Sequence, residues 1–182
     1  MDVSGAGAPA AVLETTLPRL RAAGVPVVWL NWGNRPDRAN LPPGVRHVYD
    51  PDGRSTGIGD PLPNGSRALE LGSWSAAVVD GLTVEPQDLH VARYRMSGFW
   101  DTPLDSVLKN LRVDTAVRRV NVDQCVLATL IDAACLGYDV VLVEDLCGTT
   151  SPEFCTQATV YNVRQCFGFT TTSAELLAGL PD

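Results

Sequence analysis

The stretch TAVRRVNVDQCVLATLIDAACLGYDVVLVED, residues 115–145, decides the fold of this 182-residue chain. It opens on a strand-like run, continues with apolar residues at helical spacing up to Gly137, and ends in a second apolar, β-branched run. This order predicts a strand over 114–120, a helix over 124–136 and a strand over 139–144. A strand, a helix and a strand in succession are typical of an α/β fold with a mostly parallel sheet.

The rest of the chain repeats this alternation. Strands are also predicted over 25–30, 89–93 and, at an edge, 168–171, and helices over 11–23, 73–80, 103–111, 152–166 and 174–180. Thr102 and Ser151 are expected N-caps, and Ser173 precedes the last helix. We expect one domain over residues 1–182. Its loop at about 31–66 is rich in Gly, Pro, Asn and Asp, which indicates a functional lid, an oligomer contact or disorder.

Composition excludes several classes of protein. A net charge of −7 argues against nucleic acid as a partner, and the apolar runs are too short to span a membrane. No secretory signal is visible, and the five cysteines lack a CxxC spacing, so we expect free thiols in a reducing cytoplasm. Only two histidines, His47 and His90, are present, and they lie far apart, so no metal site is expected.

Cys125 lies where the 114–120 strand turns into the following helix. The free N–H groups and partial positive charge of a helix start activate a thiol, although a small apolar residue also packs well there. In parallel sheets, ligands bind beyond the carboxyl ends of the strands. The predicted strand ends bring several side chains towards the edge that holds Cys125, namely Asn31, Trp32, Arg93, Asn121 and Asp145.

Four segments together resemble the isochorismatase-like cysteine hydrolases. They are YRMSGFWDTPLDSVLKNL (94–111), VNVDQCVLATLIDAACLGYD (120–139), VVLVEDLCGTTSPEF (140–154) and YNVRQCFGF (161–169). This superfamily holds nicotinamidases, N-carbamoylsarcosine amidases and ureidoacrylate amidohydrolases, and SGFWDTPLD and GSW match the ureidoacrylate-amidase-like branch best. The resemblance runs from about Val25 onward. It implies a three-layer Rossmann-like fold without a cofactor, in a protein that often forms oligomers.

The resemblance also implies a site chemistry, which is amide C–N hydrolysis by a Cys-Asp-Lys triad. Cys125 matches the nucleophile and Arg93 occupies the position of the lysine. The N–H groups of Asn121 and Cys125 match the oxyanion hole, beside a cis peptide at Val120–Asn121. Contacts with substrate are expected from the pocket candidates Asn31, Trp32, Phe99 and Trp100. Core packing is expected for Trp29 and Trp74, and for the other four cysteines, Cys135, Cys147, Cys155 and Cys166.

The chain departs from the family pattern in three places. No segment of the form V-x-D-x-Q-N-x-F precedes Ala11, which predicts that the general base and the first, central strand are missing. Arginine replaces the lysine, and Lys109, the chain's only lysine, lies too late to substitute. Arg119 stands where a glycine is usual. A start codon placed too late, another segment or chain in the gap, and a relic with a partial fold remain alternative explanations.

Asp123 and Asp145 are candidates to replace the missing acid/base, although Asp123 also suits a helix cap. Two hypotheses therefore remain. One is a divergent cysteine hydrolase that acts through Cys125 and Arg93 on a C–N amide or related acyl-type bond of a small molecule, as a tailoring enzyme of specialised metabolism. The other is a catalytically disabled member that binds a small molecule or a partner subunit. A homo-oligomer is expected in both cases, without nucleic acid or membrane partners.

Overall fold

The strands form two parallel sets. The computed structural model describes residues 7–113, 115–118 and 121–181. β1 (Val28–Trp32) pairs with β2 (Leu89–Arg93), with Trp32 opposite Arg93. β4 (Asp139–Val143) lies between β3 (Thr115–Arg118) and β5 (Phe169–Thr171). Every pairing between these strands is parallel, which confirms the α/β class.

Within the described residues, no strand joins the β1–β2 pair to the β3–β4–β5 set. The absence of a first, central strand from this protein stays a prediction, because residues 1–6 lie outside the described part of the chain.

Helices connect the strands, and several of them begin or end at residues other than the predicted ones. The α-helices are α1 (Gly7–Ala22), α2 (Pro43–Arg46), α3 (Leu104–Asn110), α4 (Leu127–Cys135), α5 (Glu153–Asn162) and α6 (Ser173–Ala178). Two π-helical turns, η3 (Val122–Val126) and η5 (Val163–Phe167), occupy ends that were predicted as α-helix. Two short 3₁₀ turns are η2 (Trp74–Ala76), in place of the predicted 73–80 helix, and η4 (Glu144–Leu146).

The helix caps also differ from the predicted ones. Thr172 caps α6 through a capping box with Glu175, so the cap lies one residue before Ser173. Pro152 takes the N-cap position of α5 in place of Ser151, and Pro103 takes that of α3 in place of Thr102. Thr102 still accepts a hydrogen bond from the Leu104 N–H through its hydroxyl.

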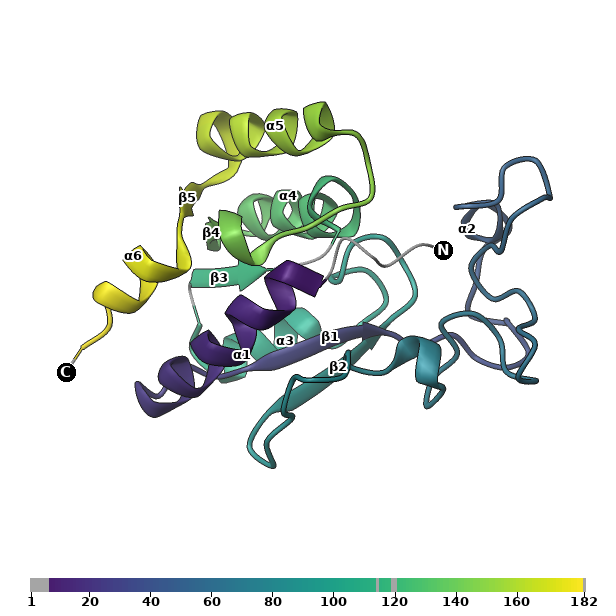
Figure 1. Cartoon of the computed structure of the whole chain (residues 1–182), viewed down its shortest axis with the longest axis horizontal. Helices are drawn as coiled ribbons and strands as arrows, with labels where there is room; N and C mark the ends of the chain where they lie inside the picture. The colour runs from purple at the N-terminus through teal and green to yellow at the C-terminus, as the bar shows by residue number, and fades with distance from the viewer. Residues whose placement is uncertain (1–6, 114, 119–120, 182) are drawn as a thin grey trace.

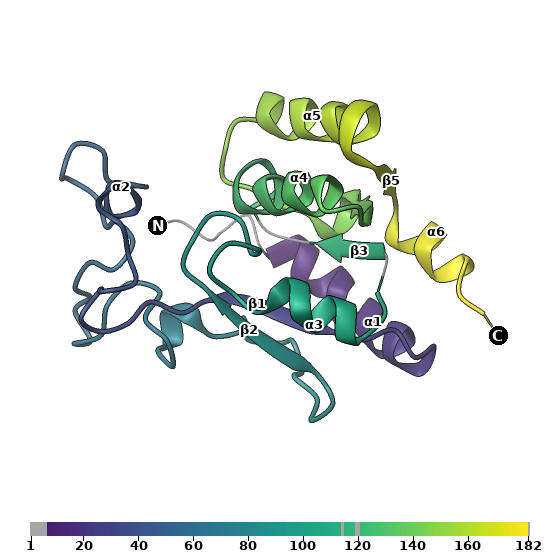
Figure 2. The same ribbon diagram turned by 180° about the vertical axis from the view of Figure 1, so that it is seen from behind.

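Two apolar clusters hold the layers together. Figures 1 and 2 show α1 on one face of the strands and α3 and α4 on the other. The main cluster joins Val91 of β2 and Leu142 of β4 to Leu130 of α4, while Leu17 of α1 packs with Val143 on the opposite face. Because each cluster contains residues that pack on both strand sets, the molecule has the predicted three-layer architecture. No described helix is both long and apolar enough to cross a membrane.

Residues 33–72, here called the loop lobe, project from the carboxyl end of β1 (Figure 1). The loop lobe has its own small core of Leu41, Ile58 and Leu69, against which Trp32, Val45, Val48, Tyr49 and Tyr94 pack. Asn34 is fully buried, and its side-chain amide donates to the Ala68 carbonyl across the lobe. The predicted long loop is therefore a packed substructure that lies directly beyond the strand ends.

Candidate active site

The structure brings Cys125 and Arg93 together. Cys125 lies in η3, between β3 and α4, and Arg93 is the last residue of β2. Each is only 5% exposed, and the two side chains interact electrostatically. Burial lowers the pKa of Arg93 from its ordinary value, while the interaction with Cys125 acts in the opposite direction. A guanidinium stays protonated in proteins, so the thiol has a fixed positive neighbour.

The Arg93 guanidinium is oriented by contacts on several sides. One terminal nitrogen donates to the Arg95 carbonyl at 2.8 Å and contacts the Met96 carbonyl at 3.5 Å. The guanidinium carbon lies 4.4 Å from the centre of the Trp32 ring, a cation–π distance. The Nε atom is buried without a hydrogen-bond partner. Arg93 is thus held in place by backbone carbonyls and by Trp32, the residue that lies opposite it on β1.

The turn that carries Cys125 is tied to the surrounding backbone. The Val122 N–H donates to the Gly148 carbonyl and the Val126 N–H to the Asn121 carbonyl, at 3.1 and 3.2 Å. The Thr129 hydroxyl donates to the Cys125 carbonyl and accepts from the Gly98 N–H. The predicted cis peptide at Val120–Asn121 lies outside the described residues, so the oxyanion hole stays a prediction.

Tyr49, a residue that the sequence reasoning missed, reaches this turn from the loop lobe. Its hydroxyl donates to Oε1 of Gln124, the residue before Cys125, at 2.6 Å. No local pattern in the glycine- and proline-rich loop singles out Tyr49, because the contact spans 75 positions in the sequence. Only the packing of the loop lobe places it there.

The two candidate carboxylates differ in their surroundings. Asp145 accepts hydrogen bonds from the N–H and the hydroxyl of Ser173, at 2.8 and 2.5 Å, and so anchors the start of α6. Asn121, not Asp123, takes the N-cap position of η3, and Oδ1 of Asp123 is buried without a hydrogen-bond partner. Asp145 is thus engaged in a structural contact, whereas one carboxylate oxygen of Asp123 has no hydrogen-bond partner.

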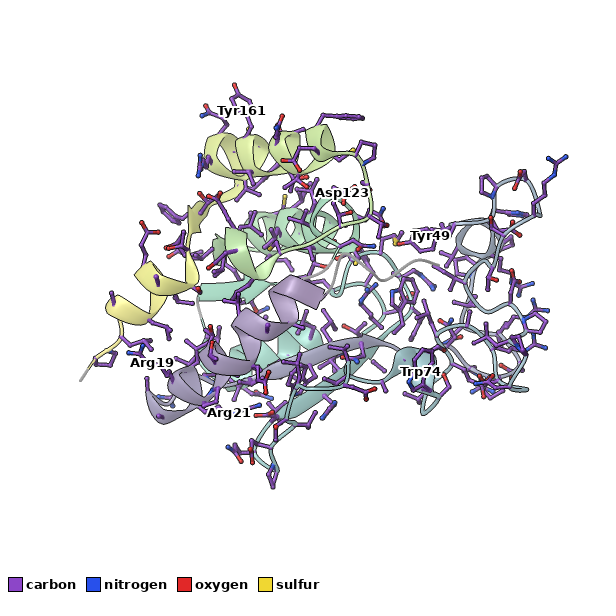
Figure 3. All side chains as sticks on the ribbon, viewed as in Figure 1. Arg19, Arg21, Tyr49, Trp74, Asp123 and Tyr161 are labelled. Carbon is purple, nitrogen blue, oxygen red and sulfur yellow. The ribbon has the colours of Figure 1, made fainter. Side chains whose placement is uncertain are left out.

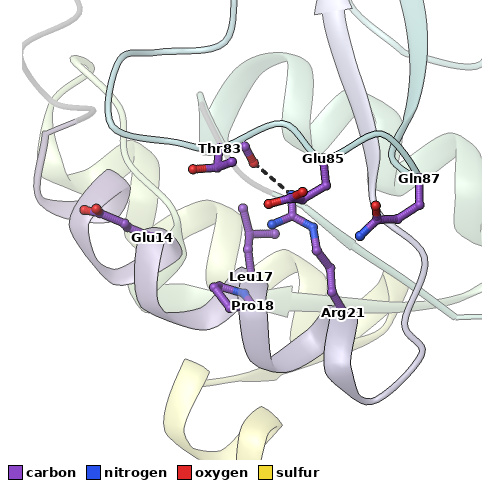
Figure 4. Close-up of a pocket in the computed structure, with 7 residues that line it drawn as sticks. All are labelled: Glu14, Leu17, Pro18, Arg21, Thr83, Glu85 and Gln87. Atoms are coloured by element: carbon purple, nitrogen blue, oxygen red, sulfur yellow. Dashed lines mark hydrogen bonds between the residues drawn. The ribbon is translucent and has the colours of Figure 1, made fainter.

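Asn31 and Trp32 line a cavity of about 210 Å³ between β1, β2 and residues 71–78. The Asn31 amide donates to the Ala76 carbonyl, which leaves its oxygen available. A larger cavity of about 290 Å³, between α1 and residues 83–87 (Figure 4), contains none of the predicted site residues. Neither Cys125 nor Arg93 lines the smaller cavity, but one of its lining residues, Trp32, contacts Arg93 through its ring.

Phe99 and Trp100 have different surroundings in the structure. Phe99 packs on the main cluster with its ring 5.8 Å from that of Tyr138, so its surroundings are those of a core residue. Trp100 is 63% exposed. Neither lines the 210 Å³ cavity, and the predicted substrate contacts of these two residues gain no support from the geometry.

Several packing predictions were wrong. Trp74 is 75% exposed rather than in the core, whereas Trp29 is half-buried and donates its indole N–H to Asp88. Cys135 and Cys166 are exposed, and Cys147 and Cys155 are only half-buried. Among the described residues, no group of three His, Cys, Asp or Glu side chains could hold a metal ion.

Comparison with known proteins decides the family. The isochorismatase domain family matches residues 3–175. The chain belongs to the isochorismatase family. The ureidoacrylate amidohydrolase RutB of Agrobacterium fabrum is 36% identical over 94% of this chain and 75% of its own length. The corresponding Rhizobium rhizogenes protein is 35% identical over 97% and 72%. This chain is thus an isochorismatase-like hydrolase, as the resemblance predicted.

Solved structures of the isochorismatase family have the same fold. An isochorismatase family protein from Desulfovibrio vulgaris superposes with a TM-score of 0.79 at 24% identity, over 96% of this chain and 85% of that one. The N-carbamoylsarcosine amidase of Thermoplasma acidophilum superposes with a TM-score of 0.71 at 23% identity, over 92% and 84%. The predicted isochorismatase fold is confirmed.

Proposed function

We propose that the protein hydrolyses the C–N bond of a small ureido or carbamoyl compound, with Cys125 as the nucleophile. The observation that carries this proposal is the burial of Cys125 beside Arg93, whose guanidinium interacts electrostatically with the thiol. An adjacent fixed positive charge favours the thiolate, which is the reactive form of cysteine. Relatives that are 36% and 35% identical are named ureidoacrylate amidohydrolases, which supports the ureido substrate class.

The reaction consists of two transfers. The Cys125 thiolate attacks the substrate carbonyl carbon and forms a C–S bond, while the N–H groups of Asn121 and Cys125 stabilise the oxyanion. Collapse of this intermediate breaks the C–N bond, and the leaving nitrogen takes up a proton. Water then attacks the thioester carbonyl, which releases the acid and restores the Cys125 sulfur.

Proton transfer in this scheme needs a group other than Arg93, because a guanidinium is not deprotonated in proteins. Asp123 is our candidate. It lies two residues before Cys125, and its buried, unpartnered Oδ1 has no structural role among the described contacts. Its charge also acts on Tyr49, as the charges of Cys125 and Arg93 do, so the three groups share one electrostatic environment.

The cavity beside Trp32 is our candidate for the substrate pocket. Its walls are largely apolar, and the Asn31 amide supplies one polar group able to orient a planar ureido substrate. Action in specialised metabolism, a cytoplasmic location and a homo-oligomeric state stay predictions from the sequence.

The test measures ammonia and amine release from ureidoacrylate and from N-carbamoyl amino acids. Cys125→Ala is expected to lower kcat by at least about 10³-fold, because the nucleophile acts with its partners as a unit. Cys166→Ser, which changes an exposed thiol, is the matched control and is expected to keep wild-type activity.

Electrospray mass spectrometry of the stopped reaction should also detect an acyl adduct on Cys125. Full activity of Cys125→Ala would refute the proposal. If the wild-type protein releases nothing from these compounds and Cys125 resists alkylation, the non-catalytic binding interpretation takes its place.

A further inference from the structure

Gln124, the residue before Cys125, is held by hydrogen bonds to three side chains, one from its own turn and two from other segments. Its Oε1 accepts from the Tyr49 hydroxyl at 2.6 Å and from the Asn121 side-chain amide at 3.3 Å. Its Nε2 donates to the Ser151 hydroxyl at 3.3 Å. The Tyr49 bond is the shortest of the three and the one that comes from the loop lobe. It therefore connects the lobe to the turn that carries the nucleophile.

The backbone and the surroundings of Tyr49 set it apart from an ordinary loop tyrosine. Its φ is +69°, in the left-handed region that bulky residues rarely adopt, so the packing of the lobe imposes this conformation. The side chain is half-buried. Figure 3 shows Tyr49 pointing from the lobe towards the body of the molecule, on the side where Asp123 lies.

The Tyr49 hydroxyl remains a hydrogen-bond donor at neutral pH. Burial raises the pKa of Tyr49 above its ordinary value, and the negative charge of Cys125 raises it further. Because Gln124 Oε1 can only accept, the protonated hydroxyl is the form that this contact requires.

We infer that Tyr49 is a positioning residue, which holds the turn 121–125 so that the N–H groups of Asn121 and Cys125 point at the developing oxyanion. The inference rests on the proposed function, since it assigns the turn a role in the same reaction. A donor aimed at an oxyanion must keep its place within a few tenths of an ångström, and a small misplacement in an active site is costly in rate. The loop lobe thereby influences catalysis through one hydroxyl group.

The kinetic test compares Tyr49→Phe with Tyr94→Phe. Tyr94 packs on the same lobe core, but its hydroxyl donates to the Asp101 carbonyl, so its loss leaves Gln124 untouched. Tyr49→Phe is expected to lower kcat by about 10- to 100-fold with KM changed less than about threefold, because ground-state contacts persist. Alkylation of Cys125 by iodoacetamide needs no oxyanion hole and is expected to stay within about twofold of wild type.

The role of Gln124 as the intermediary is tested in a double-mutant cycle. Tyr49→Phe is expected to cost nothing further in kcat once Gln124→Ala is present, because both changes remove the same contact. The inference would be overturned if Tyr49→Phe kept the wild-type kcat, or if its alkylation rate fell as much as its kcat. It would also be overturned if the losses of kcat in Tyr49→Phe and Gln124→Ala multiplied in the double variant.

Amide hydrogen exchange decides the inference even if the proposed function fails. Tyr49→Phe is expected to accelerate exchange at least about tenfold in a peptide that covers residues 121–126, and Tyr94→Phe is expected to leave it unchanged. If no ureido compound is hydrolysed by wild-type protein, the proposed function is wrong, and this measurement alone judges whether Tyr49 holds the turn. Unchanged exchange in both variants would overturn the positioning role.

Discussion

A single arginine at the end of β2 defines the electrostatics around Cys125. Arg93 is buried, yet its guanidinium contacts the sulfur, two backbone carbonyls and the Trp32 ring. Arginine keeps its charge and has a rigid fork of donors, so it can stabilise a thiolate without taking part in proton transfer. In the proposed mechanism, a second group therefore moves the proton, and Asp123 is the candidate.

Arg93→Ala is expected to slow alkylation of Cys125 at pH 7 by about tenfold, because the thiolate loses its nearest positive charge. Arg93→Lys should retain part of the rate, since the charge is kept and the fork is lost. Arg95→Ala removes the neighbouring arginine, which pairs with the half-exposed Asp101, and serves as the control. The measurement is the iodoacetamide rate at Cys125 by peptide mass spectrometry. Equal rates in all four proteins would contradict the electrostatic role.

At the scale of elements, a buried ion pair attaches α1 to the segment before β2. Arg21 contacts Asp88 at 2.6 Å, and the Asp88 side chain is only 1% exposed. The same carboxylate accepts from the Trp29 indole and from the Glu85 N–H. Burial opposes ionisation of Asp88, but the hydrogen bonds from Arg21, Glu85 and Trp29 outweigh it, so its pKa is lowered.

Asp88→Asn is expected to lower the free energy of unfolding by about 3 kcal/mol, because it leaves the largely buried Arg21 guanidinium without its counter-charge. Since the folded-state pKa lies below the unfolded one, this contribution is fully present above about pH 4 and is lost as the pH falls further. Urea unfolding at pH 7 and at pH 3 measures both effects. Asp37→Asn, in the exposed Arg35 pair, should leave stability nearly unchanged, because water and salt screen this pair. A difference between wild type and Asp88→Asn that does not become smaller between pH 7 and pH 3 would contradict the assignment.

The contact between β4 and the start of β5 depends on a glycine. A Cβ atom at Gly168 would lie 2.2 Å from the Val140 carbonyl oxygen, and backbone cannot move aside cheaply. Gly168→Ala is therefore expected to destabilise the protein by about 1–3 kcal/mol. Gly44→Ala, in α2 with nothing within 4 Å, is the control and should be neutral. Thermal unfolding followed by circular dichroism checks both, and a stable Gly168→Ala protein would show that the close approach is not required.

At the scale of the whole molecule, the two strand sets depend on shared cores. Leu13 and Leu17 of α1 pack with Val143 at the end of β4 and with Trp29 of β1, and the main cluster joins β2 to β4 on the other face. Neither set buries its apolar face alone, so we expect the two sets to unfold together.

Leu17→Ala tests this coupling. The loss of a buried side chain from the α1 cluster should cost about 2–5 kcal/mol. Tryptophan fluorescence reports on residues 29–100, where all four tryptophans lie, and far-ultraviolet circular dichroism reports also on α4 and α5. The two denaturation curves should coincide in wild type and in Leu17→Ala. Transitions at different urea concentrations would show that the strand sets are independent units.

The sequence by itself determined the α/β class, the strand at 89–93 and the family, because these depend on local periodicity and on short motifs. It also selected Arg93 and Cys125, which the structure places in contact. It did not predict the exposure of Trp74, the anchoring of α6 by Asp145, or the contact of Tyr49 with Gln124. Those features depend on how segments that are distant in the sequence pack together, and such contacts produce no local pattern of residues from which they could be predicted. Only the tertiary structure, which sets the loop lobe against the turn 121–125, decided them.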